Sequence, residues 1–279
     1  MPTPKALPSI PMGQMVHTLA KLSFLPKNNY SPTMTSGAYR SRRSSMRLQT
    51  LDLLSVLLVT ESPGETAAIS IYRAASEHIE VWYSKGRPST EVEKASIVNF
   101  IRSAVEATLV SKPETERLLR IALDMCKYKV FARIYQARQL LLRLCLDGSY
   151  GIIPSTSDAD RDLREKAKIK LRSILGEDEL PPKRSLERFL TLWFQDIILT
   201  IPLDVEFDIA ANVEFYFQTV VKCYALLILP GIDKMIEGDL LEKLRKISEY
   251  YTAVSTVHRK VQRLSPGGKA HLIRGIREV

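Results

Sequence analysis

The sequence predicts an all-α protein in which two helical lobes lie between an extended basic N-terminal arm and a basic C-terminal tail. Apolar residues recur at helical spacing, Ser or Thr caps followed by Glu recur, and Pro or Gly separates the apolar stretches. The 279 residues are 45% hydrophobic and 25% charged, an ordinary globular composition. We expect four parts, namely an arm (1–45), an N-terminal lobe (46–147), a C-terminal lobe (158–264) and a tail (265–279).

The first lobe is expected to contain four helices. A dense Leu/Val run covers 46–61, and three cap signals start the next helices at Ser62, Thr90 and Ser111, each with Glu at the third following position. The first capped helix should continue through Trp82. In 114–146 the apolar face changes side, which predicts a break near Lys127–Lys129. Arg138 falls on the apolar side there and is expected to be a paired buried charge.

The second lobe should begin after a loop at Asp147–Ser157, which holds two Gly and one Pro. Four further helices are expected, at Asp158–Leu175, Ser185–Ile201, Asp204–Leu229 and Asp233–Leu264. In the last, a seam at four-three spacing runs from Leu240 to Val261 and includes His258. The seam predicts pairing with another helix, which we assign to self-association together with the arm. The longest uncharged stretch in this lobe, Cys223–Ile232, is too short to span a membrane.

The net charge of +9 is concentrated at the two ends of the chain. Residues 1–50 contain seven basic residues and no acid, and residues 241–279 contain nine basic and three acidic residues. The 190 residues between them sum to −4. An acid-free arm rich in Arg and Ser is typical both of a nucleic-acid or assembly arm and of an organellar transit peptide. The two interpretations stay open.

Basic residues are concentrated in the arm, in the stretch 112–143 and in the last helix with the tail. This repeated concentration favours an anionic partner such as RNA. The aromatic residues expected to stack on bases where they are exposed are Tyr30, Tyr39, Trp82, Tyr83 and Tyr128. An acidic membrane surface is an alternative partner. The candidate phosphate-binding residues come from the arm, the stretch 112–143 and the last helix, and they are Arg40, Arg42, Arg43, Arg47, Arg117, Arg120, Lys127, Lys129, Arg133, Arg245, Lys246, Arg259, Lys260 and Arg263.

Catalytic and metal-binding motifs are sparse. The sequence has no GxGxxG, P-loop, HExxH or GxSxG pattern. Two acidic clusters, Asp158–Asp162 and Asp204–Asp208, are explained by the preference for acids at helix starts. The second cluster leaves a magnesium-dependent all-α enzyme of isoprenoid type as a remote alternative. The three cysteines fit reduced core residues and exclude a disulfide scaffold; they are Cys126, Cys145 and Cys223.

These observations predict a non-enzymatic, sequence-tolerant nucleic-acid-binding assembly protein without a cofactor. The layout of arm, helical lobes and tail is similar in architecture to viral nucleoproteins and to capsid or matrix subunits, although no sequence motif accompanies the similarity. We expect the chain in cytoplasm, nucleus or virion. The alternative is an organelle-targeted helical scaffold, in the organelle matrix, that pairs through the Leu240–Val261 seam and has no nucleic-acid role.

Overall fold

The structure is a computed structural model, and it describes residues 55–57, 67–73, 79–85, 88–107, 110–201, 212–264 and 273–278. The chain divides into two units, Met1–Leu48 and Gln49–Val279, close to the predicted end of the arm at residue 45. The four predicted phosphate-binding residues of the arm lie outside the described residues, and they are Arg40, Arg42, Arg43 and Arg47.

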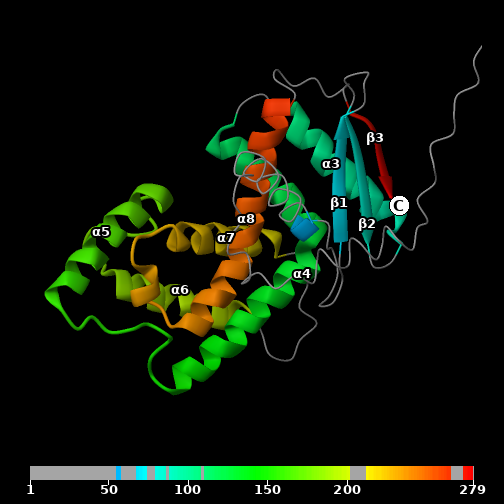
Figure 1. The fold of residues 1–279 in the computed structure, drawn as a ribbon. Coiled ribbons are helices and arrows are strands. Elements are labelled where there is room, and N and C mark those ends of the chain that lie inside the picture. The colour runs from blue at the N-terminus through cyan, green and yellow to red at the C-terminus, as the bar shows by residue number, and fades with distance from the viewer. Residues whose placement is uncertain are drawn as a thin grey trace, which may run out of the picture. The chain divides into compact units, whose positions relative to one another are not determined.

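The described part of the second unit is mostly helical, which confirms the predicted helical class (Figure 1). The predicted caps Thr90 and Ser111 are confirmed, because each side-chain oxygen accepts the backbone N–H of the third following residue. The helices are α3 (Glu91–Glu106), α4 (Lys112–Leu146), α5 (Asp158–Leu175), α6 (Leu186–Thr200), α7 (Val213–Leu227) and α8 (Gly238–Leu264), with a 3-10 turn η1 (Ile232–Lys234) before α8.

Three strands correct the strictly all-α prediction. Strand β1 (Ala67–Arg73) pairs antiparallel with β2 (Ile79–Lys85), and β3 (Ile273–Glu278) joins β2 in parallel. The sequence analysis placed one helix across the first two strands and a basic tail, with no strand assigned, at the third. The error lies in the spacing of the apolar residues, which was assigned a helical period. In fact Ile, Val and Tyr recur at every second position of β2, and Ile recurs likewise in β1, as is typical of strands.

Helix α4 continues unbroken for 35 residues, so the predicted break near Lys127–Lys129 is wrong. The large side chains that suggested a change of face, Phe131 and Tyr135, are only half-buried. A continuous stripe of buried side chains, completed by small residues, instead runs along the helix in steps of three and four residues. It consists of Leu119, Leu123, Cys126, Val130, Ile134, Ala137, Leu141 and Leu144, and further buried residues such as Leu118, Ala122 and Met125 lie beside it.

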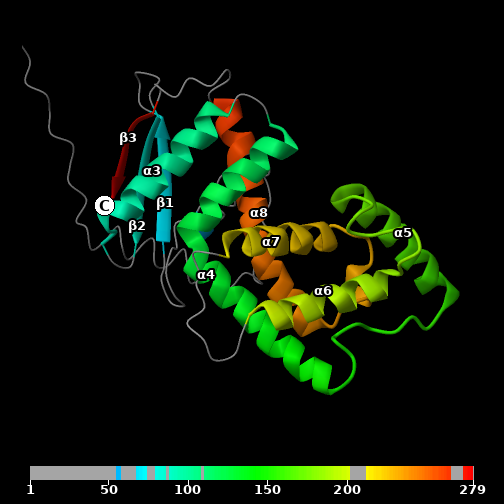
Figure 2. The same ribbon diagram turned by 180° about the vertical axis from the view of Figure 1, so that it is seen from behind.

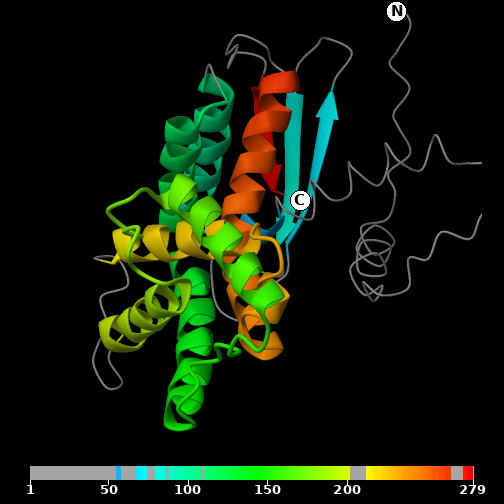
Figure 3. The same cartoon turned by 90° about the vertical axis from the view of Figure 1, so that its left-hand side faces the viewer.

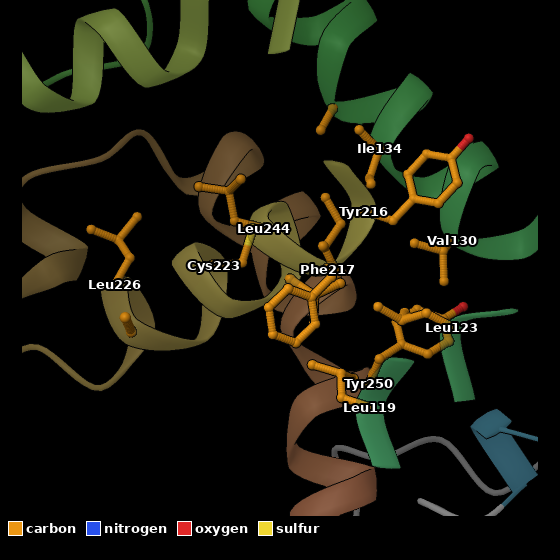
Figure 4. Packing of buried hydrophobic residues seen from close by; sticks show 14 of the residues in the cluster. Leu119, Leu123, Val130, Ile134, Tyr216, Phe217, Cys223, Leu226, Leu244 and Tyr250 are labelled. Atoms are coloured by element: carbon orange, nitrogen blue, oxygen red, sulfur yellow. The ribbon is translucent and has the colours of Figure 1, made fainter. Parts of the chain in front are cut away.

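One hydrophobic core joins α4, α7 and α8, each of which contacts the other two (Figures 2 and 3). Figure 4 shows Leu123 and Ile134 of α4 gathered with Tyr216 and Phe217 of α7 and with Leu244 of α8. Helix α4 belongs to the first predicted lobe, whereas α7 and α8 belong to the second. The two predicted lobes therefore share one core instead of meeting at a boundary.

The apolar seam of α8 lies inside this core. Leu240, Leu244, Ile247 and Val254 are completely buried, and so is His258, whose Nδ1 lies 3.2 Å from Oγ1 of Thr115 on α4. The chain's own helices cover the described part of the seam. This corrects the prediction that the seam mediates self-association.

The loop after α4 packs against the start of α8 instead of hinging freely. The N–H of Ile153 donates to the carbonyl of Met235 at 3.0 Å, and the N–H of Glu237 donates to the carbonyl of Gly151 at 2.8 Å. Gly148 and Gly151 adopt positive φ within it, as tight turns require. The loop thereby fixes where α4 ends relative to α8.

Candidate nucleic-acid interface

The outward side of α4 gathers four residues that the sequence analysis singled out: Arg117, Arg120, Lys127 and Tyr128. At 100° per residue they lie within roughly 100° around the helix axis and about 17 Å along it. The side chains of Arg117 and Arg120 are 46% and 45% exposed. Tyr128 is 52% exposed and is the one aromatic among the exposed large apolar residues of the described chain. We call these four residues the α4 stripe.

Each cation of the α4 stripe is paired with a carboxylate in the structure. Arg117 pairs with Glu114 at 2.9 Å and Lys127 with Asp124 at 3.1 Å, both one turn away on α4. Arg117 and Asp124 are exposed, whereas Glu114 and Lys127 are half-buried, Lys127 with 24% of its side chain exposed. Exposed pairs of this kind contribute about 0–1 kcal/mol and weaken with salt, so a phosphate can replace the carboxylate at low cost.

Arg120 reaches across to α7. Its Nε and Nη2 donate to the two carboxylate oxygens of Glu214, at 3.2 and 3.3 Å, and its guanidinium lies 3.6 Å from the ring centre of Phe217. Partial burial raises the pKa of Glu214, but hydrogen bonds from Arg120 and Gln218 outweigh it and hold that pKa below its usual range. Glu214 is therefore ionised at neutral pH and fixes the orientation of Arg120.

Arg133 does not belong to the α4 stripe, although the sequence analysis grouped it with the phosphate-binding residues. Its side chain is 18% exposed and points to α8, where it pairs with Glu249 at 3.1 Å and donates to the carbonyl of Lys246. Its guanidinium also lies 5.0 Å from the ring centre of Tyr250. Lys129 is half-buried on a different side of α4 from the stripe. The geometry gives Arg133 a role in joining α4 to α8.

The predicted cations of α8 are exposed where the structure describes them. Arg245 and Lys246 both reach Glu242, at 2.7 and 3.8 Å. Arg259 is exposed, and its Nε donates to the carbonyl of Ser255 in the preceding turn. The side chains of Lys260 and Arg263 lie outside the described residues.

Three other basic residues bind the C-terminal ends of helices, a role that the sequence analysis missed. Lys112 donates to the carbonyl of Ile174 at the end of α5, at 3.1 Å. Arg138 does the same for Ile198 of α6 at 3.1 Å, and Lys170 for Ile228 after α7 at 2.9 Å. A cation at a helix C-terminus satisfies an orphan carbonyl and complements the helix dipole. No local sequence signal reveals these contacts, because each spans about sixty residues of chain.

Arg138 is buried, as predicted, but it is not paired with a carboxylate in the described structure. Only 3% of the residue is exposed, and its Nη1 has no hydrogen-bond partner. The carbonyl of Ile198 is the acceptor for its Nε. The prediction of a buried ion pair at Arg138 is therefore wrong, because its charge is held by the C-terminal end of α6.

The acidic cluster Asp158–Asp162 opens helix α5 behind its N-cap Ser157. Hydrogen bonds with Ser157 and Thr156 lower the pKa of Asp160, as expected for an acid at a helix start. Among the described residues no group of three His, Cys, Asp or Glu side chains is placed to hold a metal ion. The second cluster, Asp204–Asp208, lies outside those residues.

The cysteines lie in the helical body, as expected. Cys126 and Cys223 are buried and Cys145 is half-buried, and all three are free thiols. Burial raises the pKa of the Cys223 thiol far above its usual range, so this thiol stays protonated and unreactive.

Comparison of the chain with models of protein families, with curated proteins and with solved structures found no match. Within the part of the chain that the structure describes, no helix is both long and apolar enough to cross a membrane.

Proposed function

We propose that this chain is a non-enzymatic assembly protein that binds single-stranded RNA without sequence preference. The α4 stripe carries the proposal. One helix presents three cations and an exposed tyrosine ring on one side, over about 17 Å. Cations contact phosphates whatever the base, and an aromatic ring stacks on any unpaired base. A surface of this kind suits a protein that coats RNA and does not read it.

The basic ends of the chain supply the remaining positive charge in this proposal. Residues 1–50 add seven cations without an acid, and the proposal assigns phosphate contacts there to Arg40, Arg42, Arg43 and Arg47. The exposed cations of α8 add Arg245, Lys246 and Arg259. Each phosphate contact contributes through counterion release, so affinity depends on how many are made together. If many copies of the chain coat one RNA in this way, the protein has an assembly role of nucleocapsid, capsid or matrix type.

The rival interpretation, a helical scaffold that pairs through the seam of α8, requires that seam to be accessible to another helix. The described seam residues are buried, except for half-buried Tyr251, and α8 packs against α4 and α7. In the α4 stripe, in contrast, Arg117, Arg120 and Tyr128 are exposed, and they combine the two residue types that contact single-stranded nucleic acid. This contrast supports RNA binding over helix pairing.

Fluorescence anisotropy with a labelled 20-nucleotide oligo(U) tests the proposal at low salt. We expect Arg117→Gln/Arg120→Gln/Lys127→Gln to weaken binding at least tenfold, and Tyr128→Ala to weaken it about tenfold, since stacking is worth about 1–3 kcal/mol per base. The matched control, Arg102→Gln/Lys166→Gln/Lys183→Gln, removes three exposed cations from other parts of the body and should change affinity less than threefold. Equal losses in both triple variants would refute a role for the stripe. Binding to acidic lipid vesicles but not to oligo(U) would favour a membrane partner instead.

A further inference from the structure

Arg120 is held more firmly than the other cations of the α4 stripe. Its Nε and Nη2 donate to different oxygens of Glu214, at 3.2 and 3.3 Å, whereas Nε and Nη2 of Arg117 share a single oxygen of Glu114. A two-point contact of this kind fixes the plane of the guanidinium as well as its position. Lys127 carries a point charge on a flexible stem and has no such plane.

The partner of Arg120 is itself fixed in place. Glu214 stands in the first turn of α7, where the helix dipole favours a carboxylate, and Nε2 of Gln218 donates to its Oε1 at 2.9 Å. Asp124, one turn beyond Arg120 on α4, is a second carboxylate, with 66% of its side chain exposed. A phosphate that approached Arg120 would therefore meet a compensated charge and two carboxylates.

One face of the Arg120 guanidinium is covered and the other is open to solvent. Its Cζ lies 3.6 Å from the ring centre of Phe217, a residue of α7 that is 3% exposed. At this distance the guanidinium must lie nearly flat on the ring, because an edge-on group would bring a nitrogen well inside the contact distance of about 3.5 Å. The side chain of Arg120 is nonetheless 45% exposed. The exposed surface thus includes the face of the plane that points away from Phe217.

An arginine plane that is open on one face can stack on an unpaired base, as aromatic rings do. We propose that Arg120 stacks on a base of the bound RNA and does not contact a phosphate, with Glu214 as the residue that positions it. This role rests on the proposed RNA binding and deepens it, because the nucleobase becomes the ligand of Arg120. Tyr128 lies about 12 Å further along α4 and provides a second stacking surface. The α4 stripe then contacts bases with Arg120 and Tyr128 and phosphates with Arg117 and Lys127.

Lysine substitutions separate an arginine that stacks from one that supplies charge. Arg120→Lys keeps the positive charge but loses the plane, so it should weaken binding to the 20-nucleotide oligo(U) by about fivefold or more at low salt. The matched control Arg117→Lys keeps what a phosphate contact needs and should bind within about twofold of the unmodified chain. On an abasic ribose-phosphate chain of the same length, which offers no base, Arg120→Lys and the unmodified chain should bind equally.

Removal of Glu214 tests its positioning role, because the expected effect has the opposite sign to a purely electrostatic one. Glu214→Ala makes the chain more positive, so charge alone predicts tighter binding to oligo(U). We expect binding weaker by about threefold or more, because Arg120 loses the contact that orients its plane. The matched control Glu106→Ala removes an exposed carboxylate of α3 and should leave the affinity unchanged or slightly higher.

Fluorescence anisotropy measures all of these affinities on the full-length chain, and circular dichroism checks that each variant is folded. The stacking role of Arg120 is overturned if Arg120→Lys binds oligo(U) as tightly as the unmodified chain. It is also overturned if Arg120→Lys loses as much affinity for the abasic chain, or if Glu214→Ala binds oligo(U) more tightly. An unmodified chain that does not bind oligo(U) overturns RNA binding itself and this role with it, so the two failures are distinguishable.

Discussion

At the scale of single residues, Arg138 shows how a buried charge can be held without a counter-ion. Its guanidinium lies in the interior and donates to the C-terminal end of α6. A buried charge contributes little net stability, so an apolar side chain of similar length should replace it without loss. We expect Arg138→Met to leave the free energy of unfolding unchanged or to raise it. Arg138→Ala, which leaves a cavity, should lower it by about 2–3 kcal/mol.

Urea denaturation of the two variants checks this prediction. If Arg138→Met lowers the free energy of unfolding as much as Arg138→Ala does, the hydrogen bond to Ile198 contributes more to stability than packing does. The conclusion that the buried charge adds little net stability would then be wrong.

The pair of Arg164 with Glu187 links α5 to α6 and makes stability depend on pH. Arg164 is 5% exposed and pairs with Glu187 at 2.8 Å. Burial raises the pKa of Glu187, but hydrogen bonds with its own backbone N–H and with Arg164 outweigh that effect and hold the pKa below its usual range. A depressed carboxyl pKa gives stability that is present above the unfolded value and is lost as the pH falls through the folded value.

We therefore expect Glu187→Gln to destabilise the protein by about 1–2 kcal/mol at pH 7, allowing for the partial exposure of the carboxylate. The difference in stability should shrink as the pH falls through the lowered pKa of Glu187, because the carboxylate is then protonated in both states. Thermal melts between pH 2.5 and pH 7 provide the comparison. A constant difference across that range would show that the pair is not the cause.

At the scale of elements, the connection from α7 to α8 contains a glycine, Gly231, at which any added side chain meets Leu163 of α5. Gly231 has φ +71°, and a Cβ there would lie 2.2 Å from Cδ2 of Leu163 on α5. Gly148 has a similar φ of +78° but no atom within 4 Å of such a Cβ. Gly148→Ala should thus cost only backbone strain, about 1–2 kcal/mol. Gly231→Ala adds a clash and should cost about 2–4 kcal/mol.

The melting temperatures of these two alanine variants separate the two effects. Equal costs would mean that Leu163 moves aside freely and that α5 is loosely attached to the turn.

The helices could be predicted from the sequence because their signals are local. Thr90 and Ser111 cap their helices through residues three positions away, and the seam of α8 repeats every three or four residues. The sheet was missed because short period-two runs were assigned a helical period. The unbroken core stripe of α4 was missed because the apolar face was assigned from large side chains such as Phe131. Phe131 is only half-buried, whereas the small side chain of Ala137 is fully buried.

The candidate site could be predicted only in part for a related reason. Arg117, Arg120 and Lys127 lie on one side of α4, a relation that helical spacing alone reveals. The difference between Arg120, which is exposed, and Arg133, which joins α4 to α8, depends on Glu214 and Glu249, about a hundred residues away. Long-range contacts of this kind leave no trace in the local pattern of a single sequence.

At the scale of the whole molecule, the excess positive charge belongs to the ends and much of the body's own charge is neutralised internally. Residues 51–240 sum to −4, and the cations on the α4 stripe are paired with carboxylates. The proposed RNA affinity must then come from many exposed contacts made together, each screened by salt. This account predicts a steep dependence of RNA affinity on ionic strength.

The dissociation constant for oligo(U), measured between 50 and 300 mM salt, tests this central claim most directly. Contact with about six phosphates predicts a logarithmic slope of association near −4, since single strands contribute about −0.7 per phosphate. Preparations from cells should also carry nucleic acid until nuclease and high salt remove it. A flat salt dependence, or no binding to oligo(U) at 50 mM salt, would contradict the proposal that this protein binds RNA.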